Sequence, residues 1–480
     1  MSLAFERIDP WRVRIPRAGG MRTDGLVFAD EKLFTSMGGE DALKQVANVA
    51  HLPGIVGPSM AMPDIHWGYG FPIGGVAAFD VDEGVVSPGG VGYDINCGVR
   101  LLRSNLPREA VAGREKDLVH ALFRGIPTGV GSRRRGEGVL DKREEKAALV
   151  QGARWAIGRG WGWSSDLDHI EEGGAIAGAD PDLVSERARE RGRPQAGTLG
   201  SGNHFVEVGY VETVFDEAAA AVLGLEKGAL TVIIHTGSRG LGYQVCDDFL
   251  KVMVRAAQKY GISLPDRQLC CAPLKSTEGR EYLAAMAAAA NFAFLNRQTI
   301  AHYVREAFEK TMKFSPREHG LSTVYDVCHN IAKMETHEWQ GVKRRLCVHR
   351  KGATRAFPPG HPAIPPEYRA IGQPVIIPGD MGRYSYVLTG AAGSAEAFGS
   401  TCHGAGRQMS RTAAKASARG RHIGEELARK GITLEAEGMD TVLEEIPEAY
   451  KDVSDVVNVV QGAGLSRKVA RLVPIGVIKG

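Results

Sequence analysis

Two short stretches contain the residues best suited to chemistry. One is GTLGSGNHFVEVG, in which Asn203, His204 and Glu207 interrupt an apolar run. The other is STCHGAGR, in which His403 stands directly before Gly404-Ala405-Gly406 and a stretch rich in helix-forming residues. Backbone N–H groups at a glycine-rich helix N-terminus bind phosphate. The second stretch therefore predicts a histidine that acts on a nucleotide phosphate at the start of a helix.

Five residues, one of them already named, have side chains that bind metal ions. The loop SPGGVGYDINCGVR contains Asp94 and Cys97, and His204, His235 and His329 each close or interrupt an apolar run. A histidine there is more often a structural residue with satisfied hydrogen bonds, and a free cysteine is more often a small buried hydrophobe. The full set is too rich for one closed tetrahedral site, whereas two metals that share a thiolate would use all five. Both interpretations stay open.

Three further segments suit a nucleotide site but also have ordinary interpretations. In HTGSRG, Arg239 lies between glycines, which indicates either a phosphate-facing turn or an ordinary basic loop. The segment PGDMGRYSY (378–386) is rich in turns and hydroxyls, which suits a nucleotide pocket or any surface loop. The tail VPIGVIKG is apolar up to Lys479. Apolar tails usually dock in the body of a protein, so Lys479 is either carried inward or left solvated.

The elements that must position these residues are mixed along the chain. Helical periodicity predicts helices over 40–52, 140–158, 182–191, 282–313 and 407–430, the last ending at Gly431 as a C′ residue. Short apolar runs predict strands over 75–81, 98–102, 204–208, 230–235, 345–349 and 375–377. Because strands and helices do not alternate in βαβ units, we predict an α+β fold. The chemically suggestive residues are scattered along the chain, which favours one compact catalytic domain over residues 1–480.

Composition limits the class of protein. The chain has 480 residues, of which 61 are glycines. Its net charge is only +3, so the overall charge does not indicate that the protein binds a polyanion. Local basic runs such as residues 187–193 are either solvated surface or RNA-binding clusters. Seven cysteines without framework spacing indicate a reducing compartment. With no long apolar run and no signal-peptide core at the N-terminus, we expect a cytoplasmic protein that does not insert in a membrane.

Eight motifs, in this order, identify a family. MPDIHWGYGFPIGG, GGVGYDINCGVR, GTLGSGNHFVEV, HTGSRGLG, YDVCHN, HRKGATRAF, PGDMGRYSYVL and CHGAGR resemble the RtcB family of RNA-splicing ligases over essentially the whole chain. The resemblance implies a single RtcB-like domain of mixed β-sheets surrounded by helices. It also implies a ligase that joins RNA 2′,3′-cyclic phosphate or 3′-phosphate ends to 5′-hydroxyl ends, in tRNA splicing, RNA repair or both. Tyr450 enters the site only through this resemblance.

The resemblance implies a role for each site residue. His403 would be guanylylated by GTP and would pass the guanylate to an RNA 3′-phosphate, giving an RNA(3′)pp(5′)G intermediate. Two Mn²⁺ ions would be bound by Asp94, Cys97, His204, His235 and His329, with Cys97 bridging. A thiolate with imidazoles suits zinc, so the choice of manganese comes from the resemblance alone. Asp64 would orient the nucleophilic histidine. The guanylate contacts would be Asn203, Phe205, Glu207, Pro378, Gly379, Asp380, Met381, Ser385, Gly404, Ala405, Gly406, Tyr450 and Lys479.

The expected partners are GTP, broken RNA or tRNA halves, and an accessory activator protein. Arg239, Arg407 and Arg411 are the candidates for RNA phosphates, because a planar guanidinium suits them. Two rival functions use the same ligands. A dinuclear metallophosphodiesterase would act on cyclic phosphate ends without a nucleotide, and an RNA-binding protein would hold structural metal. Labelling of His403 by GTP separates the ligase from both.

Overall fold

Four of the five predicted metal ligands lie at or next to the ends of strands of the larger β-sheet. The computed structural model describes residues 3–37, 40–134 and 139–480. Neighbouring strands along the main path of this sheet are antiparallel, and the parallel strand β18 (Thr433–Ala436) adds beside β19. The path runs β11 (Ser322–Cys328), β7 (Gly98–Pro107), β9 (Ala229–Thr236), β8 (Phe205–Val214), β19 (Ser466–Lys479), β16 (Ser385–Gly390) and β15 (Pro374–Ile377).

The second sheet has seven strands. Its only parallel pair among the described residues is β3 with β4. The order is β1 (Glu6–Asp9), β2 (Arg12–Ile15), β3 (Gly25–Phe28), β4 (Ile55–His66), β5 (Ile73–Asp80), β13 (Val342–Lys351) and β12 (Asn330–Trp339). Two small pairs complete the strands: β6 (Val85–Val86) with β10 (Ala272–Pro273), and β14 (Ala353–Arg355) with β17 (Ser400–Cys402).

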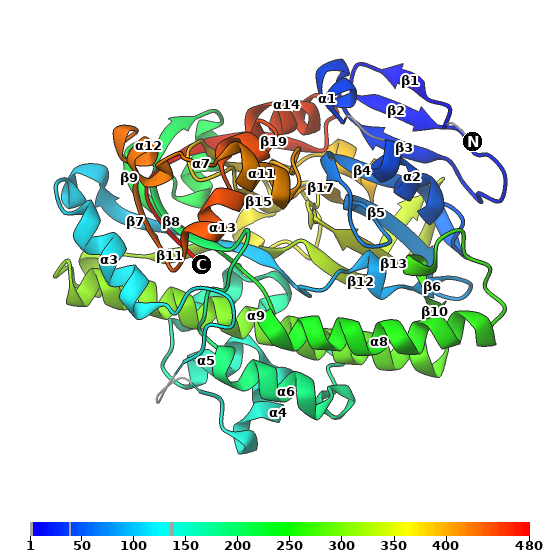
Figure 1. Cartoon of the computed structure of the whole chain (residues 1–480), viewed down its shortest axis with the longest axis horizontal. Coiled ribbons are helices and arrows are strands. Elements are labelled where there is room, and N and C mark those ends of the chain that lie inside the picture. The colour runs from blue at the N-terminus through cyan, green and yellow to red at the C-terminus, as the bar shows by residue number, and fades with distance from the viewer. Residues whose placement is uncertain (1–2, 38–39, 135–138) are drawn as a thin grey trace.

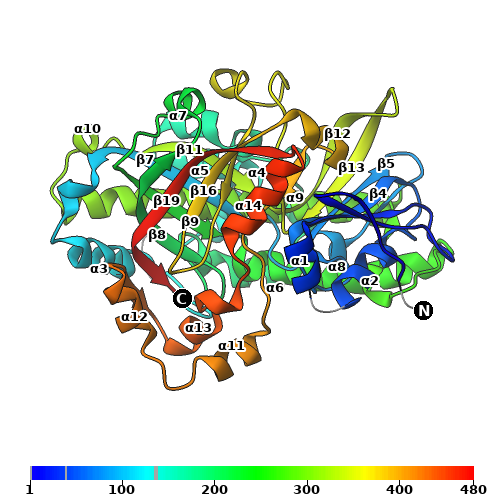
Figure 2. The ribbon, with the colours of Figure 1, turned by 90° about the horizontal axis from the view of Figure 1, so that it is seen from above.

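Two long helices, α8 (Arg239–Lys259) and α9 (Thr277–Lys310), run along one side of the molecule and pack on each other (Figure 1). Figure 2 shows β19 crossing the middle of the molecule, with α11 to α13 gathered beside its C-terminal end. The other helices are α1 (Glu31–Ser36), α2 (Glu40–Val49), α3 (Glu115–Gly125), α4 (Lys142–Gln151), α5 (Ala153–Gly158), α6 (Glu186–Gly192), α7 (Glu217–Leu223), α10 (Pro316–His319), α11 (Arg411–Ser417), α12 (Ile423–Arg429), α13 (Met439–Glu444) and α14 (Val453–Gly462). No helix among the described residues is both long and apolar enough to cross a bilayer.

The α+β prediction is confirmed, and each predicted strand lies in an observed one apart from a residue at its ends. Two helix predictions were wrong in extent. The 140–158 helix breaks at Gly152, whose φ of +56° interrupts the helical path. The 407–430 helix is two short ones separated around Gly420, where φ is +80°, although Gly431 does follow the second with a positive φ. The elements that were not predicted include α8, β4 and the strand β19 formed by the tail.

Candidate active site

The five predicted metal ligands lie together because neighbouring antiparallel strands begin and end at the same edge. Cys97 directly precedes β7, His204 directly precedes β8, His235 is the penultimate residue of β9, and His329 directly follows β11. The register confirms the convergence, since His235 is paired with both Val99 and Phe205. In an antiparallel sheet the start of one strand meets the end of the next. Sheet topology therefore brings these side chains to one point.

The ligand atoms are within coordination range of one another. Cys97 Sγ lies 3.5 Å from His204 Nε2 and 3.4 Å from His235 Nε2. The set divides into two groups that share Cys97: Cys97, His235 and His329, and Asp94, Cys97 and His204. Within each group the ligand atoms lie within 4.8 Å of one another. A shared thiolate between two groups of N, S and O donors is the arrangement expected for a pair of metal ions.

Burial puts the imidazoles in the form that binds metal. The pKa values of His235 and His329 are held well below the usual range, first by burial and then by neighbouring cationic groups. Their two Nε2 atoms face each other at 3.4 Å, and His235 Nδ1 has no hydrogen-bond partner among the described residues. Burial likewise raises the pKa of the Cys97 thiol, which only a bound cation would reverse. The donor set therefore fits a metal site better than a set of structural hydrogen bonds.

His403 is oriented by a buried carboxylate. Its Nδ1 lies 2.6 Å from Asp64 Oδ2, and its backbone N–H donates to the same oxygen at 3.0 Å. Burial alone would raise the pKa of Asp64, but attraction to His403 and the hydrogen bonds outweigh it and lower the pKa. The His403 ring lies 4.7 Å from the ring of the predicted metal ligand His329, centroid to centroid. Because Nδ1 is engaged, Nε2 is the nitrogen left for nucleophilic attack.

The prediction that His403 lies at a helix N-terminus is wrong. His403 follows β17, and the next helix, α11, begins only at Arg411, where Ser410 caps it. Gly404 already donates its N–H to Asp64 at 3.3 Å. At Gly406 φ is +72°, and a Cβ there would lie 2.1 Å from the Asp64 carbonyl oxygen. The glycines thus serve close packing of the His403 loop against β4, because a side chain would collide with that strand.

Two buried lysines that sequence reasoning missed hold β4 and the loop after it in place. Lys451 Nζ donates to the carbonyls of Pro63 and Ile65, at 2.9 and 2.7 Å, on both sides of Asp64. Lys351 Nζ donates in the same way to the carbonyls of Tyr69 and Phe71. Burial lowers the pKa of Lys451 to about 8 and that of Lys351 to about 7. Both lysines donate to backbone carbonyls, which every residue has, so no sequence pattern predicts these roles.

The predicted guanine-facing residues form a second polar cluster. Ser385 Oγ donates to Glu207 Oε1 at 3.2 Å, and burial raises the pKa of Glu207 to about 8. Glu445, which sequence reasoning missed, accepts hydrogen bonds from the Tyr450 hydroxyl and lies 3.8 Å from Lys479 Nζ. The register of β19 with β8 accounts for the position of Lys479, which is paired with Phe205. The tail thus carries its lysine inward.

One cavity of about 490 Å³ joins the metal ligands, His403 and this polar cluster. Asp64, His204, Ser385 and Arg239 lie outside its lining, and the first three bond to residues that line it. The predicted residues that line it are Asp94, Cys97, Asn203, Phe205, Glu207, His235, His329, Pro378, Gly379, Asp380, Met381, His403, Gly404, Ala405, Gly406, Arg407, Arg411, Tyr450 and Lys479. A volume of this size accommodates a nucleotide-sized ligand.

The three predicted RNA-binding arginines differ in their surroundings. Arg239 is the first residue of α8, with φ of +55°, and donates to Thr198 and Ser132 under the Gly200 turn. Arg407 lines the cavity but is held by Glu445 at 2.9 Å. The Arg411 side chain is 61% exposed and contacts only Glu444 at 3.4 Å among its ion pairs with described residues. Arg411 is therefore the one most accessible to an incoming polyanion.

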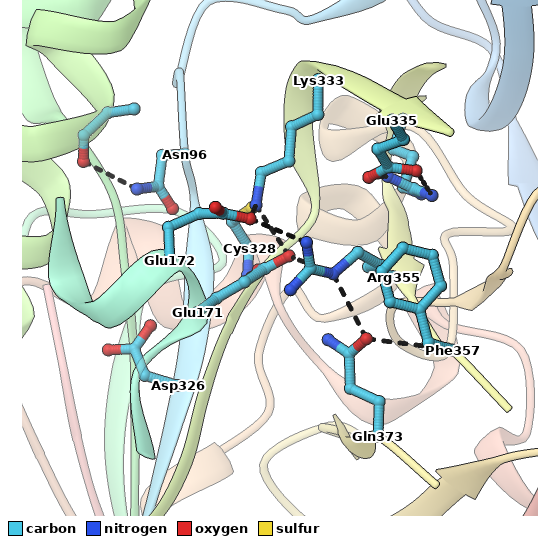
Figure 3. Close-up of polar contacts among 12 residues, drawn as sticks. Asn96, Glu171, Glu172, Asp326, Cys328, Lys333, Glu335, Arg355, Phe357 and Gln373 are labelled. Carbon is cyan, nitrogen blue, oxygen red and sulfur yellow. Dashed lines mark hydrogen bonds and ion pairs between the residues drawn. The ribbon is translucent and has the colours of Figure 1, made fainter. Parts of the chain in front are cut away.

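A buried ion network supports the loop that carries His329. Figure 3 shows Lys333 and Arg355 pointing toward the paired carboxylates Glu171 and Glu172. Glu171 also accepts from the backbone N–H of Cys328 at 2.9 Å, one residue before His329. Burial opposes ionisation of Glu171, but the two cations lower its pKa. Buried charges persist only when paired, so this network fixes the end of β11.

The possible metal ligands and the carboxylate-held His403 line or adjoin one nucleotide-sized cavity, which is therefore the candidate active site. The model of the family described as tRNA-splicing ligase RtcB matches residues 45–480, and the chain belongs to this family of ligases. It is 56% identical to the tRNA-splicing ligase RtcB of Archaeoglobus fulgidus, with both chains covered completely. The protein of the same name from Thermococcus kodakarensis is 54% identical over 99% of each chain, and that from Aeropyrum pernix is 52% identical over the whole of each.

Proposed function

We propose that this protein is an RNA ligase that uses GTP to join RNA 3′-phosphate or 2′,3′-cyclic phosphate ends to 5′-hydroxyl ends. The observation that carries the proposal is the place of His403. It is held through Nδ1 by Asp64, lies against the His329 ring and lines the cavity. A histidine fixed in one tautomer between a metal cluster and a nucleotide-sized cavity is suited to covalent transfer of a nucleotide.

Three transfers account for the reaction. His403 Nε2 attacks the α-phosphorus of GTP, forming an N–P bond as the bond to the β-phosphate oxygen breaks and pyrophosphate leaves. An oxygen of the RNA 3′-phosphate then attacks the guanylate phosphorus, giving RNA(3′)pp(5′)G and freeing His403. Finally, the 5′-hydroxyl of the second strand attacks the RNA 3′-phosphorus, loses its proton and expels GMP. A cyclic phosphate is first hydrolysed by water to the 3′-phosphate. Asp64 keeps the Nδ1 proton in place throughout.

Two metal ions, proposed to be Mn²⁺, would be held by Asp94, Cys97, His204, His235 and His329, with Cys97 shared. When bound, such ions neutralise phosphate charge and orient phosphoryl groups. The buried, neutral imidazoles and the two groups of ligands that meet at Cys97 support this assignment. We assign a tRNA-splicing role to this activity because the relatives are named tRNA-splicing ligases.

The guanylate would occupy the polar cluster around Glu207 and Glu445. Glu207 would accept from the N1–H and N2–H₂ edge of guanine, with Ser385 and Lys479 beside it and Tyr450 stacked on the base. Asn203, Phe205, residues 378–381 and the 404–406 loop would enclose the rest. Support comes from the lining of the cavity, to which all of these residues except Ser385 belong. Ser385 is hydrogen-bonded to Glu207. Arg239, Arg407 and Arg411 are proposed to bind RNA phosphates, Arg411 with the most exposed side chain of the three.

A ligation assay with defined ends tests the proposal. One strand ends in a 3′-phosphate and the other begins with a 5′-hydroxyl. The two strands are incubated together with the protein and Mn²⁺, in the presence of GTP, of ATP or of no nucleotide. We expect a joined product with GTP, and none from a 3′-hydroxyl paired with a 5′-phosphate. A strand that ends in a 2′,3′-cyclic phosphate is assayed in the same way, and hydrolysis of this end without joining and without any effect of GTP would favour a metallophosphodiesterase instead.

A further inference from the structure

Three tyrosines of the cavity have no part in the proposed guanylate transfer. Tyr69 lies in the loop after β4, Tyr93 directly precedes the predicted ligand Asp94, and Tyr243 is in the second turn of α8. They come from segments far apart in the sequence, and all three line the cavity. The predicted guanine-facing residues belong to other segments, on β8, β16 and β19. The tyrosines therefore form a separate part of the lining.

The rings make a continuous aromatic row that ends at solvent. The Tyr69 and Tyr93 rings meet edge to face, with centroids 5.7 Å apart. Tyr93 and Tyr243 are stacked, with centroids 4.7 Å apart and planes 24° apart. The guanidinium carbon of Arg191 lies 5.2 Å from the Tyr243 centroid. Tyr243 is 47% exposed, whereas a ring that serves only the core is normally buried.

The row is held in place by hydrogen bonds around it. Lys351 fastens the Tyr69 loop through the Tyr69 and Phe71 carbonyls, and Gly70 donates its N–H to Gln268 at 2.9 Å. Arg191 is itself fixed by a hydrogen bond to Gln244 at 3.0 Å, one residue along α8 from Tyr243. A ring that is fixed before a ligand arrives loses little entropy on binding. The row is thus a preorganised surface.

We propose that Tyr93, Tyr243 and Arg191 bind an unpaired nucleobase at the end of an RNA strand and thereby position that end for reaction. This inference rests on the proposed function, from which it takes RNA as the ligand. Proteins bind single-stranded RNA by stacking bases on aromatic rings and on arginine planes, whatever the base. Tyr93, the middle ring of the row, directly precedes the predicted metal ligand Asp94, and both residues line the cavity, so the row adjoins the predicted metal ligands.

The variant Tyr243→Ala removes the exposed ring without disturbing the core, and Tyr243→Trp keeps an aromatic face. The matched control is Tyr260→Ala, since Tyr260 is 39% exposed at the other end of the same helix. Each protein is titrated with short fluorescent RNAs that end in a 3′-phosphate or begin with a 5′-hydroxyl, and binding is followed by anisotropy. A second set of RNAs has an abasic residue at the terminal position.

We expect Tyr243→Ala to weaken binding of one of the two intact ends by about tenfold, the usual size of a base–aromatic stack. Tyr243→Trp and Tyr260→Ala should bind like the wild type. On the abasic RNA, Tyr243→Ala should have no further effect, because the base that it would contact is already missing. Equal losses on intact and abasic RNA, or no loss at either end, would overturn the proposal.

Guanylylation of His403 is measured on the same proteins, with GTP and without RNA. The wild type and Tyr260→Ala should be labelled at the same rate, because Tyr260 is not among the residues that line the cavity. If His403 is labelled but Tyr243→Ala shows no base-dependent loss of binding, the proposed role of the tyrosine row is refuted and the proposed ligase function stands. If Tyr243→Ala shows a base-dependent loss of binding but His403 is not labelled, guanylate transfer is refuted and the tyrosine row stands as an RNA-binding surface.

Discussion

GTP binding should be coupled to release of a proton from Glu207. The carboxyl group is buried, accepts one hydrogen bond from Ser385, and lies near a second carboxylate, Asp380. Burial, the larger cause, raises its pKa to about 8. At pH 7 only about one molecule in ten therefore carries the ionised form. Accepting hydrogen bonds from both N1–H and N2–H₂ of guanine requires that form, because a protonated carboxyl has only one oxygen that is purely an acceptor.

The sign and size of the pH dependence follow from this pKa. Below pH 8 the association constant for GTP should rise about tenfold per pH unit, and above pH 8 it should level off. At pH 7 each bound GTP should release about 0.9 proton. In the protein without nucleotide the raised pKa has the opposite effect on folding. Its contribution to stability is full below the ordinary glutamate pKa and is lost as the pH rises through about 8.

Calorimetry in two buffers of different ionisation enthalpy measures this proton release. The titration is done on His403→Ala, so that no covalent step follows binding. Glu207→Gln in the same background binds a nucleotide with the same ionisable groups but lacks the carboxyl group. Its proton release at pH 7 should therefore be smaller by about 0.9 proton per bound GTP. Glu212→Gln, on the same strand β8, is the matched control and should behave like its parent. Equal proton release with and without Glu207 would refute the reasoning and would mean that Glu207 binds guanine as a neutral acid.

Three further predictions concern the supports of the site. Asp64→Asn should slow guanylylation by about 10²–10⁴-fold at unchanged GTP affinity, as measured by single-turnover labelling, because His403 loses the carboxylate that fixes its tautomer. Cys97→Ser should lower the bound metal measured by mass spectrometry, since a hydroxyl is a poor shared ligand, and unchanged metal content would contradict the site. Glu171→Gln should lower the unfolding free energy in denaturant by about 3–5 kcal/mol, because Lys333 loses a buried partner, and a loss below ~1 kcal/mol would show that the network contributes little.

The sequence was most informative where chemistry and strand ends coincide. Cys97, His204, His235 and His329 each adjoin or close an apolar run, and the structure confirms the strands predicted beside the first three, while the strand before His329 was not predicted. The metal roles of these residues stay predictions, as does a single catalytic domain over residues 1–480. The helix predicted from residue 407 begins only at Arg411; its start was predicted too early because the alanine- and arginine-rich stretch that follows favours helix. Close packing of the Gly406 loop on Asp64 overrides that preference.

Residues that act through the backbone or through distant partners left no pattern to read. Lys451 bonds two carbonyls that flank Asp64, almost 390 positions earlier in the chain, and nothing in the local sequence around either points to the other. Glu445 contacts Arg407, Tyr450 and Lys479, and the position of β19 in the sheet brings Lys479 to it. Long-range contacts of this kind depend on strand pairing, which a single sequence does not specify.

The central claim is that His403 takes up guanylate from GTP. Purified protein is incubated with Mn²⁺ and α-labelled GTP, denatured and separated by electrophoresis, with His403→Ala beside the wild type. The account predicts a label on the wild type only, labile in acid and stable in alkali, as a phosphoramidate should be. Absence of label on fully metal-loaded wild type, or an equal label on His403→Ala, would contradict it.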